Sequence, residues 1–247
     1  MESRSFTRPR ALGVALFLLL AATPGCMWGT GGNNQVGLAG TPLPQPLVTT
    51  LWNNDNQPLA GITLHFSVVQ GGGSVSPASG VTDGSGRVQT ALALGAAPGL
   101  NKVVATTGLQ GVKNDPFTFT AWAADSASWT IYNDQNATRA QHGLPPLQMN
   151  VGLCQLAQGW SNQMAAQGFI SHNPALASSV AGIFPNWMAA AENVGVGPTS
   201  NVGALYQAFL DSPHHYENIV GDYNYVGVAS TFVGGTFYVT IDFAKAP

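Results

Sequence analysis

The few side chains that could do chemistry in this sequence gather in its second half. Charged residues make up only 8% of the 247-residue chain, against about 25% in a typical soluble domain. After residue 26 the chain has two glutamates, Glu192 and Glu217, and both lie in that half. Four of the five histidines lie there too: His142, His172, His214 and His215. Imidazole and carboxylate groups in such an uncharged sequence are the first candidates for a functional site.

His172, Glu192 and His215 could together hold a metal ion. Two histidines and one glutamate with an open coordination position suit a catalytic zinc. In a hydrolase, His172 and His215 would instead hold the metal and Glu192 would act as general base on a bound water. The sequence has no His-Glu-x-x-His, the usual zinc-peptidase signature, and no Gly-x-Ser-x-Gly elbow. The residue types therefore leave two interpretations open: a metal site, or hydrogen-bonded histidines at loop ends.

For the segments that position these residues, the sequence predicts helices followed by a hairpin. Residues 126–141, 151–167 and 201–210 have helical composition and periodicity. Gly234-Gly235 is a two-residue hairpin signal between strands predicted at 226–232 and 236–243. This order predicts an α+β domain with helices packed on an antiparallel sheet. Cys154 falls in the second helix, where we expect a small buried hydrophobe rather than a nucleophile.

The first half reads as a β-sandwich. Residues 62–69 alternate apolar and polar with period two, which places His65 on the outward side. Further strands are expected at 47–52, 103–107 and 117–122, separated by turns rich in glycine and asparagine.

The first 25 residues read as a signal peptide. Three arginines precede an apolar run over residues 11–22, too short for the roughly 20 residues of a membrane span. Thr23-Pro24-Gly25-Cys26 resembles the lipobox of bacterial lipoproteins, although Thr23 and Pro24 depart from its usual residues. The resemblance implies lipidation of Cys26, attachment to a membrane, and a tether over residues 26–32. Ordinary signal cleavage near the same place is the alternative.

Composition also excludes one class of partner. From residue 26 onward there are five basic and ten acidic residues. Such a chain has no basic patch to neutralise phosphates, so we expect no binding to nucleic acid.

Residues 33–123 resemble the group 1 bacterial Ig-like domain of invasin and intimin stalks. The motifs that carry this resemblance are Gln57-Pro58-Leu59-Ala60-Gly61, Phe66-Ser67-Val68, Gly71-Gly72-Gly73, Thr82-Asp83-Gly84-Ser85-Gly86 and Gly99-Leu100-Asn101. The family implies a spacer or an adhesive stalk.

Residues 124–247 resemble the CAP superfamily, also called the SCP domain, in its bacterial branch. The resemblance runs through Asn136-x-x-Arg139-x-x-x-Gly143-Leu144, His172-Asn173-Pro174, Glu192-Asn193-Val194-Gly195, Ser212-Pro213-x-His215-x-x-Asn218-Ile219 and Val226-Gly227-Val228. It implies an α-β-α sandwich whose cavity holds two histidines and two acids, with the histidine pair binding a divalent metal in several members.

Carried over by motif, the resemblance makes His172 and His215 the metal ligands, for zinc or another divalent ion, and Glu192 the first acid. Ser212 stands where animal members have the second acid. Asn193 and the extra imidazole of His214 join the expected cavity, and Glu192 is the candidate catalytic residue. Arg139 is expected to make an internal ion pair or a helix-end contact. We expect Glu217 to cap a helix or lie in solvent.

Three classes of function remain open at this stage. The first is an exported or cell-surface lipoprotein in which the CAP-like domain binds a lipid, a cell-envelope fragment or a partner, with the Ig-like domain as spacer. The second is a metal-dependent hydrolase acting on peptide or cell-wall material. The third is an adhesin that binds through the Ig-like domain.

Overall fold

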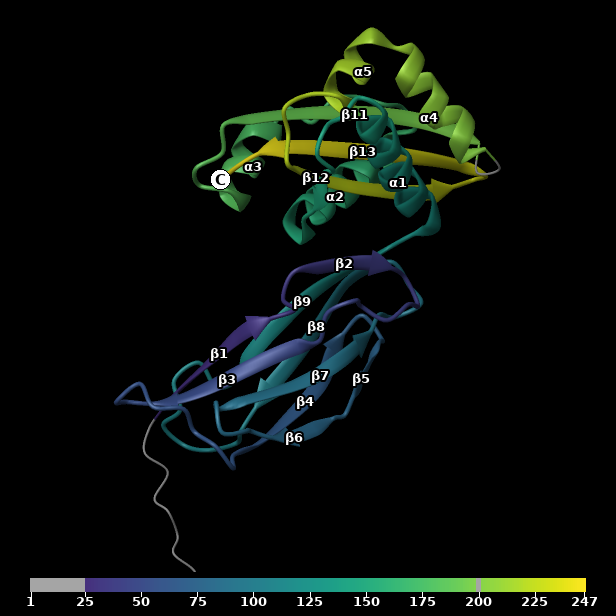
Figure 1. The fold of residues 1–247 in the computed structure, drawn as a ribbon. Coiled ribbons are helices and arrows are strands. Elements are labelled where there is room, and N and C mark those ends of the chain that lie inside the picture. Colours follow the sequence, from purple (N-terminus) through teal and green to yellow (C-terminus); the bar gives the residue numbers. More distant parts are fainter. Residues whose placement is uncertain (1–24, 199–200) are drawn as a thin grey trace, which may run out of the picture.

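The computed structural model describes residues 25–198 and 201–247, which fold into two domains joined end to end (Figure 1). The predicted signal peptide lies outside the described residues except for Gly25. Within the described part of the chain, no helix is long and apolar enough to cross a membrane.

The first domain is a sandwich of two sheets, as the alternating pattern predicts. One sheet has the order β1 (Gly25–Gly31), β3 (Leu47–Asn53), β7 (Arg87–Ala93), β5 (Ser74–Ser76). The other has the order β2 (Gln35–Leu38), β9 (Phe117–Ala124), β8 (Gly99–Thr106), β4 (Thr63–Gln70), β6 (Ser79–Val81). Leu47, Leu64 and Phe119 lie in the core between them, and His65 is exposed as expected.

The tether expected over residues 26–32 is wrong. Residues 25–31 form β1, which pairs antiparallel with β3. Met27 is fully buried in the core, while the neighbouring Cys26 and Trp28 point outward. The burial of Met27 explains the difference, because it commits the segment to the sandwich from its first residues.

The second domain is an α-β-α sandwich, which confirms the predicted fold class. Its sheet has the order β10 (Gln148–Met149), β12 (Tyr225–Val233), β13 (Thr236–Lys245), β11 (Ala189–Pro198). One face packs against α1 (Ser126–Gln141), α4 (Val202–Asp211) and α5 (Pro213–Ile219). The opposite face packs against α2 (Val151–Gln167) and α3 (Leu176–Ile183).

Local capping explains why α1 and α2 begin and end where the sequence predicts. Asp125 and Asn150 accept hydrogen bonds from backbone N–H groups in the first turns of α1 and α2. Gly168 ends α2 in the left-handed conformation, with φ 78°. Within α2, Cys154 is fully buried, and this burial raises the pKa of its thiol to about 12. Cys154 is thus the inert small hydrophobe that the sequence predicts.

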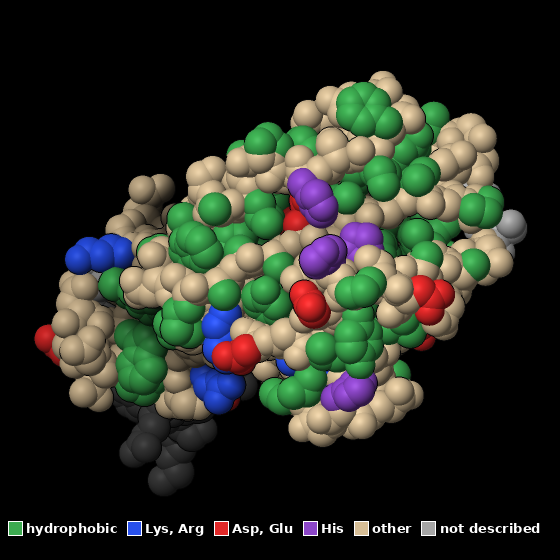
Figure 2. All heavy atoms as spheres, turned by 90° about the horizontal axis from the view of Figure 1, so that it is seen from above, with side chains coloured by type: hydrophobic (Ala, Val, Ile, Leu, Met, Phe, Trp, Pro, Cys, Tyr) green, Lys and Arg blue, Asp and Glu red, His purple; other side chains and the backbone are tan. Residues whose placement is uncertain are grey.

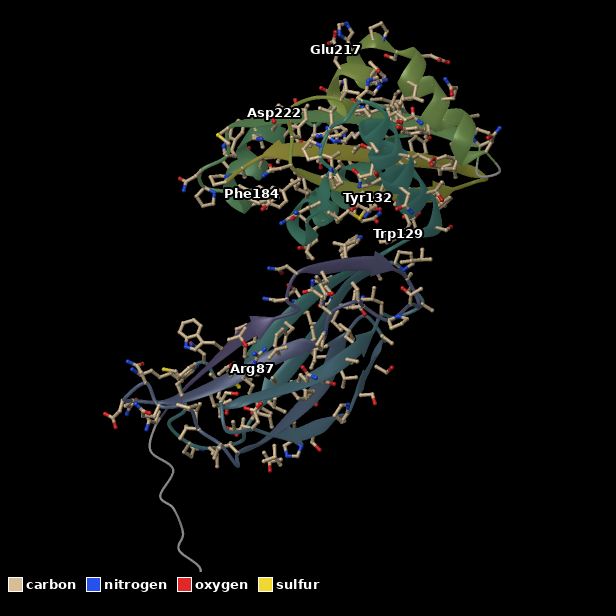
Figure 3. The ribbon with its side chains drawn as sticks, viewed as in Figure 1. Arg87, Trp129, Tyr132, Phe184, Glu217 and Asp222 are labelled. Atoms are coloured by element: carbon tan, nitrogen blue, oxygen red, sulfur yellow. The ribbon has the colours of Figure 1, made fainter. Side chains whose placement is uncertain are left out.

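The two domains meet without a linker. β9 ends at Ala124 and α1 begins at Ser126, with Asp125 between them as the helix cap. Trp122 and Ala124 share a buried apolar cluster with Val151 and Cys154 of α2. Trp129 packs against the same cluster and lies on the part of α1 nearest the first domain (Figure 3). This shared cluster fixes the second domain to the end of the first.

Candidate ligand and metal site at His172 and His215

Glu192 orients His172 through a short hydrogen bond. Glu192 lies on β11, the edge strand of the sheet, and its side chain is only 2% exposed. Nδ1 of His172 lies 2.8 Å from Oε1 of Glu192, and the imidazole is 65% exposed. A carboxylate can only accept, so Nδ1 carries the proton and donates. In the neutral form of His172 the lone pair is therefore on Nε2, the nitrogen that Glu192 does not engage.

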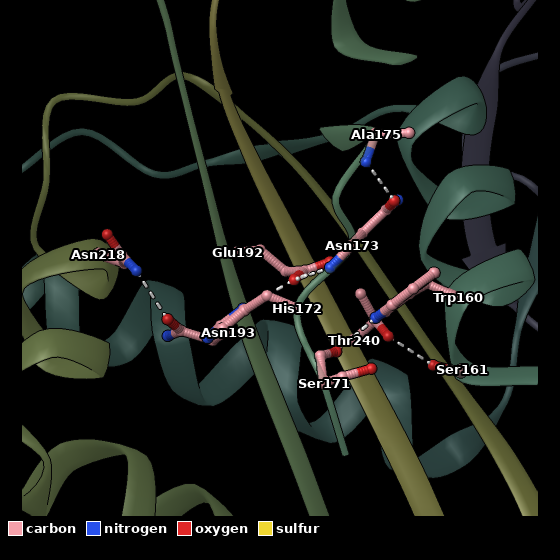
Figure 4. A network of polar contacts seen from close by, with 10 residues as sticks. All are labelled: Trp160, Ser161, Ser171, His172, Asn173, Ala175, Glu192, Asn193, Asn218 and Thr240. Atoms are coloured by element: carbon pink, nitrogen blue, oxygen red, sulfur yellow. Dashed lines mark hydrogen bonds and ion pairs between the residues drawn. The ribbon is translucent and has the colours of Figure 1, made fainter. Parts of the chain in front are cut away.

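The loop that carries His172 is held on both sides of this residue (Figure 4). The indole N–H of Trp160, on α2, donates to the carbonyl of Ser171 at 2.6 Å. The backbone N–H of Asn173 donates to the same Glu192 oxygen at 2.9 Å. These bonds place the imidazole against β11 although the segment is neither helix nor strand.

A second buried acid, Asp242 of β13, lies behind Glu192. The two residues are directly opposite in the register of β11 and β13, and Asp242 is fully buried. Burial, followed by the charge of Glu192 and a side-chain hydrogen bond to it, raises the pKa of Asp242 well above its usual range. Among the described residues, no N–H or hydroxyl group donates to Oε2 of Glu192 or to either Asp242 oxygen. A proton on Asp242, shared with Glu192, satisfies the pair.

The carboxyl pair is the functional element that the sequence did not reveal. The alternation of strand 236–243 places Asp242 on the side that carries Tyr238 and Thr240, an acid within an apolar strand. That alternation was the available signal, but the partner strand β11 was not predicted.

His215 reaches the same edge strand from the opposite face of the sheet. Asn193 follows Glu192 on β11 and donates through its side chain to the carbonyl of His215 at 3.0 Å. Asn218 of α5 donates in turn to Asn193 at 2.8 Å. The ring of His215 packs edge-on against Phe209, with 5.1 Å between centroids. Asn193 and Asn218 thus link β11 to α5.

The two metal-ligand candidates are close enough to influence each other. Burial, then the positive charges of His172 and His214, lower the pKa of His215. A lowered pKa keeps this imidazole neutral at neutral pH, which is the form that binds a metal. Histidine side chains gather on this face of the second domain, beside acidic ones (Figure 2).

Other predicted members stand apart from this pair. The side chain of His214 is 95% exposed and lies 3.8 Å from Glu217, so it points to solvent rather than into a cavity. Glu217 is exposed as well, as expected. Ser212 is half-buried between α4 and α5 and makes no side-chain cap for α5. The sequence also did not predict that His142 contacts Tyr216, at 2.7 Å from Nε2 to the hydroxyl.

Arg139 has a structural role behind the site. It is 1% exposed and donates to the backbone carbonyls of four residues at 2.8–3.2 Å: Pro145, Ile219, Gly221 and Tyr223. These carbonyls lie around the ends of α1 and α5, so the helix-end contact is the correct one of the two expectations for Arg139. The guanidinium fixes α5, and with it His215, against α1.

Few side chains at this site are available to bind a metal ion. In the described ranges, no group of three or more histidine, cysteine, aspartate or glutamate side chains is arranged to hold a metal ion. The carboxylate of Glu192 is turned to His172, Asn173 and Asp242. Two imidazoles remain that could hold an ion.

Comparison with known proteins assigns a family to the second domain. Residues 132–243 match the CAP family, described as the cysteine-rich secretory protein family. No curated protein matches the chain. The solved structures similar to this chain include an outer surface protein from Borrelia burgdorferi, with 16% identity and a TM-score of 0.45 over 49% of this chain and 93% of that one.

Two further structures resemble larger or different parts of the chain. An extracellular protein containing an SCP domain from Bacillus anthracis str. Ames has 16% identity and a TM-score of 0.42 over 87% of this chain and 73% of that one. A two-domain fragment of intimin has 19% identity and a TM-score of 0.30, over 42% of this chain and 46% of that one. By its family match, the second domain of this chain is a CAP domain, spanning residues 132–243.

Proposed function

We propose that this protein is an exported binding protein, anchored at Cys26, whose CAP domain captures a ligand through His172 and His215 with a divalent metal ion between them and the ligand. The observation that carries the proposal is the 2.8 Å hydrogen bond from His172 to the buried Glu192. A carboxylate behind a metal-binding histidine fixes the tautomer and the ring orientation and raises its basicity.

The residues present fit a weak, open metal site. Nε2 of His172 carries a lone pair, and the lowered pKa of His215 keeps a second neutral imidazole beside it. Zinc accepts imidazole nitrogen and favours four ligands, so two positions would remain for a ligand. A metal held there would act as a Lewis acid toward oxygen or nitrogen groups of that ligand.

The surroundings of Glu192 favour binding over hydrolysis. Its side chain is 2% exposed, one oxygen is taken by His172 and Asn173, and the other faces Asp242. A general base must reach the water that it activates. Glu192 is committed to holding His172, which argues against the role of base that a metal hydrolase would require.

The surface beside His172 suits a ligand with apolar parts. Phe169 is 59% exposed and Ile170 is 44% exposed, and they precede His172 on the same loop. Large apolar side chains left in solvent next to a polar site mark binding surfaces. This favours a lipid or an apolar cell-envelope fragment over a highly charged ligand.

Anchoring at Cys26 is compatible with the position of this residue. Cys26 is half-buried and lies on the outward-facing side of β1. Cleavage before it would remove Gly25, whose carbonyl accepts a hydrogen bond from Lys113 at 2.7 Å. Gly25 also pairs with Asn53 of β3, so cleavage would remove the terminal residue pair of the strand, at about 1 kcal/mol for each hydrogen bond lost.

Titration calorimetry with zinc on the intact two-domain protein tests the proposed site. We expect one zinc per chain, bound at pH 7.5 and released as the pH is lowered, because protons compete with the metal for imidazole nitrogen. The double variant His172→Ala/His215→Ala should lose binding, while His214→Ala, with a neighbouring exposed imidazole, should keep it. Equal binding by all three proteins, or loss in His214→Ala alone, would contradict the assignment.

A further inference from the structure

The far end of the first domain carries an aromatic surface that the CAP site does not use. Trp28 is 53% exposed and Trp52 is 36% exposed, although most large apolar side chains of this domain are buried. They border a hollow of about 540 Å³ lined by Cys26, Trp28, Trp52, Asn53, Asn54, Asn56 and Lys113. We call this surface the tip. The sequence alone did not indicate any aromatic binding face in this domain.

Strand register places the tip around Cys26. Cys26 and Trp52 are directly opposite each other on β1 and β3, and Trp28 is two residues further along β1. Side chains two apart on a strand share a face, so all three point outward from the same side of the sheet. The start of β1 and the turn after β3 lie at the end of the domain away from the CAP domain (Figure 1).

We infer that the tip rests in the headgroup layer of a phospholipid bilayer, with Trp28 and Trp52 at the membrane–water interface. The inference rests on the proposed anchoring at Cys26. Because β1 pairs with β3 from its first residues, acyl chains on Cys26 would leave the fold directly beside Trp52. No flexible tether separates anchor and domain, so the bilayer surface must lie against these side chains.

The composition of the tip suits an interface rather than the hydrocarbon core. Tryptophan combines an apolar ring system with one N–H donor, and it concentrates at membrane–water interfaces. The asparagine amides and the exposed Lys113 suit hydrated headgroups and phosphate oxygens. Asp55 is also exposed in the same turn, so the two charges offset each other. We therefore expect contact that depends on tryptophan and changes little with salt.

This contact would set the orientation of the whole molecule. The apolar cluster at the domain junction holds the CAP domain at the opposite end of the sandwich (Figure 1). A tip resting on the bilayer would hold His215, on α5, further from the membrane than the length of the first domain, because α5 lies on the side of the CAP domain away from it (Figure 1). Two contacts, acyl chains and tryptophans, would limit tilting more than acyl chains alone.

Fluorescence quenching in vesicles tests the inference with the full lipidated chain. The protein, purified from membranes, is reconstituted into phosphatidylcholine vesicles with bromine near the headgroup end of the acyl chains, which quenches nearby indoles. We expect clear quenching in the wild type, unchanged by added salt. Trp28→Phe/Trp52→Phe should lose most of it. Trp187→Phe, in the CAP domain, removes one of the six tryptophans as a matched control and should keep it.

Mass spectrometry of the same sample separates the two ways to fail. An acylated protein without quenching would overturn the interfacial contact while the anchor stands. A protein without acyl groups on Cys26 would overturn the anchor, and the inference with it. A spectral shift of Trp28 and Trp52 on soluble peptidoglycan fragments, with no quenching in vesicles, would assign the tip to a glycan and contradict the inference.

Discussion

Asp242 and Glu192 form a pair of carboxyl groups removed from solvent, which is an expensive arrangement for a fold to keep. Ionising both would place two like charges side by side in a poorly solvated interior. The raised pKa of Asp242 shows how this is avoided, since it retains a proton where an exposed aspartate would not. The pair holds the Glu192 carboxylate in place for His172. Burying two acids therefore costs stability but maintains the geometry of the site.

Replacing Asp242 by asparagine should stabilise the protein at neutral pH. The folded state holds a proton on Asp242 that the unfolded state releases above its ordinary pKa near 3.8. The stability contributed by this proton is complete below that pKa and is lost as the pH rises. Asparagine keeps a donor toward Glu192 without the proton uptake. At pH 7 we expect Asp242→Asn to raise the free energy of unfolding by about 1 kcal/mol, or Tm by about 2–4 °C. The gap between the variant and the wild type should widen from pH 4 to pH 7.

Thermal melts across that pH range measure the effect, with Asp222→Asn as the matched control. Asp222 is 88% exposed and pairs with Lys245 at the surface, so its replacement should change Tm little at any pH. A Tm gap between Asp242→Asn and wild type that stays constant from pH 4 to pH 7 would show that Asp242 is not protonated in the folded state.

At the scale of elements, helix α2 and strand β12 depend on the absence of one side chain. A Cβ on Gly227 would lie 2.2 Å from the backbone carbon of Leu153 and 2.6 Å from the amide nitrogen of Cys154. These are backbone atoms of α2, so they cannot rotate away as the end of a flexible side chain could. Gly227 thus lets the helix approach the sheet, and α2 in turn carries Trp160, which fixes the His172 loop.

Gly227→Ala should therefore destabilise the protein by about 1–3 kcal/mol. Gly159→Ala is the control on the same helix, because it is exposed and a Cβ there would meet no described atom within 4 Å. Alanine in an open helix position should instead stabilise by about 0.5–1 kcal/mol. Urea unfolding measures whether each substitution lowers or raises the free energy of unfolding. Equal effects from the two substitutions would mean that α2 does not lie as close to β12 as described.

Elements with strong local signals were predictable from the sequence. The helices at 126–141 and 151–167 have the predicted bounds, and Gly234-Gly235 forms the hairpin turn with φ values of 58° and 79°. Strand β11 was missed because Ala189–Pro198 is rich in alanine and glycine and lacks a clear alternation. β1 begins at Gly25, the last residue of the predicted signal peptide, and was therefore not predicted as part of the fold.

Only those site residues that belong to short sequence motifs could be predicted. His172, Glu192 and His215 were named from short sequence patterns, and Glu192 does bind His172. Asp242 was out of reach, because its role depends on the register between β11 and β13. The outward orientation of His214 depends on the placement of α5, which Arg139 fixes through carbonyls distant in sequence. Tertiary contacts decided each of these outcomes.

At the scale of the whole molecule, the cluster at the junction should make the two domains unfold together. The described cluster joins Trp122 and Ala124 of β9 to Val151 and Cys154 of α2, with Trp129 packed against it. We expect one calorimetric transition for the wild type. Trp129→Ser should remove about 2 kcal/mol of apolar contact and divide the transition in two. Trp187→Ser, inside the CAP domain, should lower Tm but leave a single transition. Two transitions in the wild type would contradict this coupling.

Glu192 fixes His172 with its proton on Nδ1 and its lone pair on Nε2, and the proposed metal site depends on this tautomer. Nitrogen-detected NMR of the imidazoles at pH 7.5, with assignment by His172→Ala, reads the tautomer directly. We predict an Nδ1–H tautomer for His172 in the wild type and a mixed population in Glu192→Gln. Zinc should then shift Nε2 of His172 and one ring nitrogen of His215 together. An Nε2–H tautomer in the wild type, unchanged by Glu192→Gln, would contradict the role assigned to Glu192.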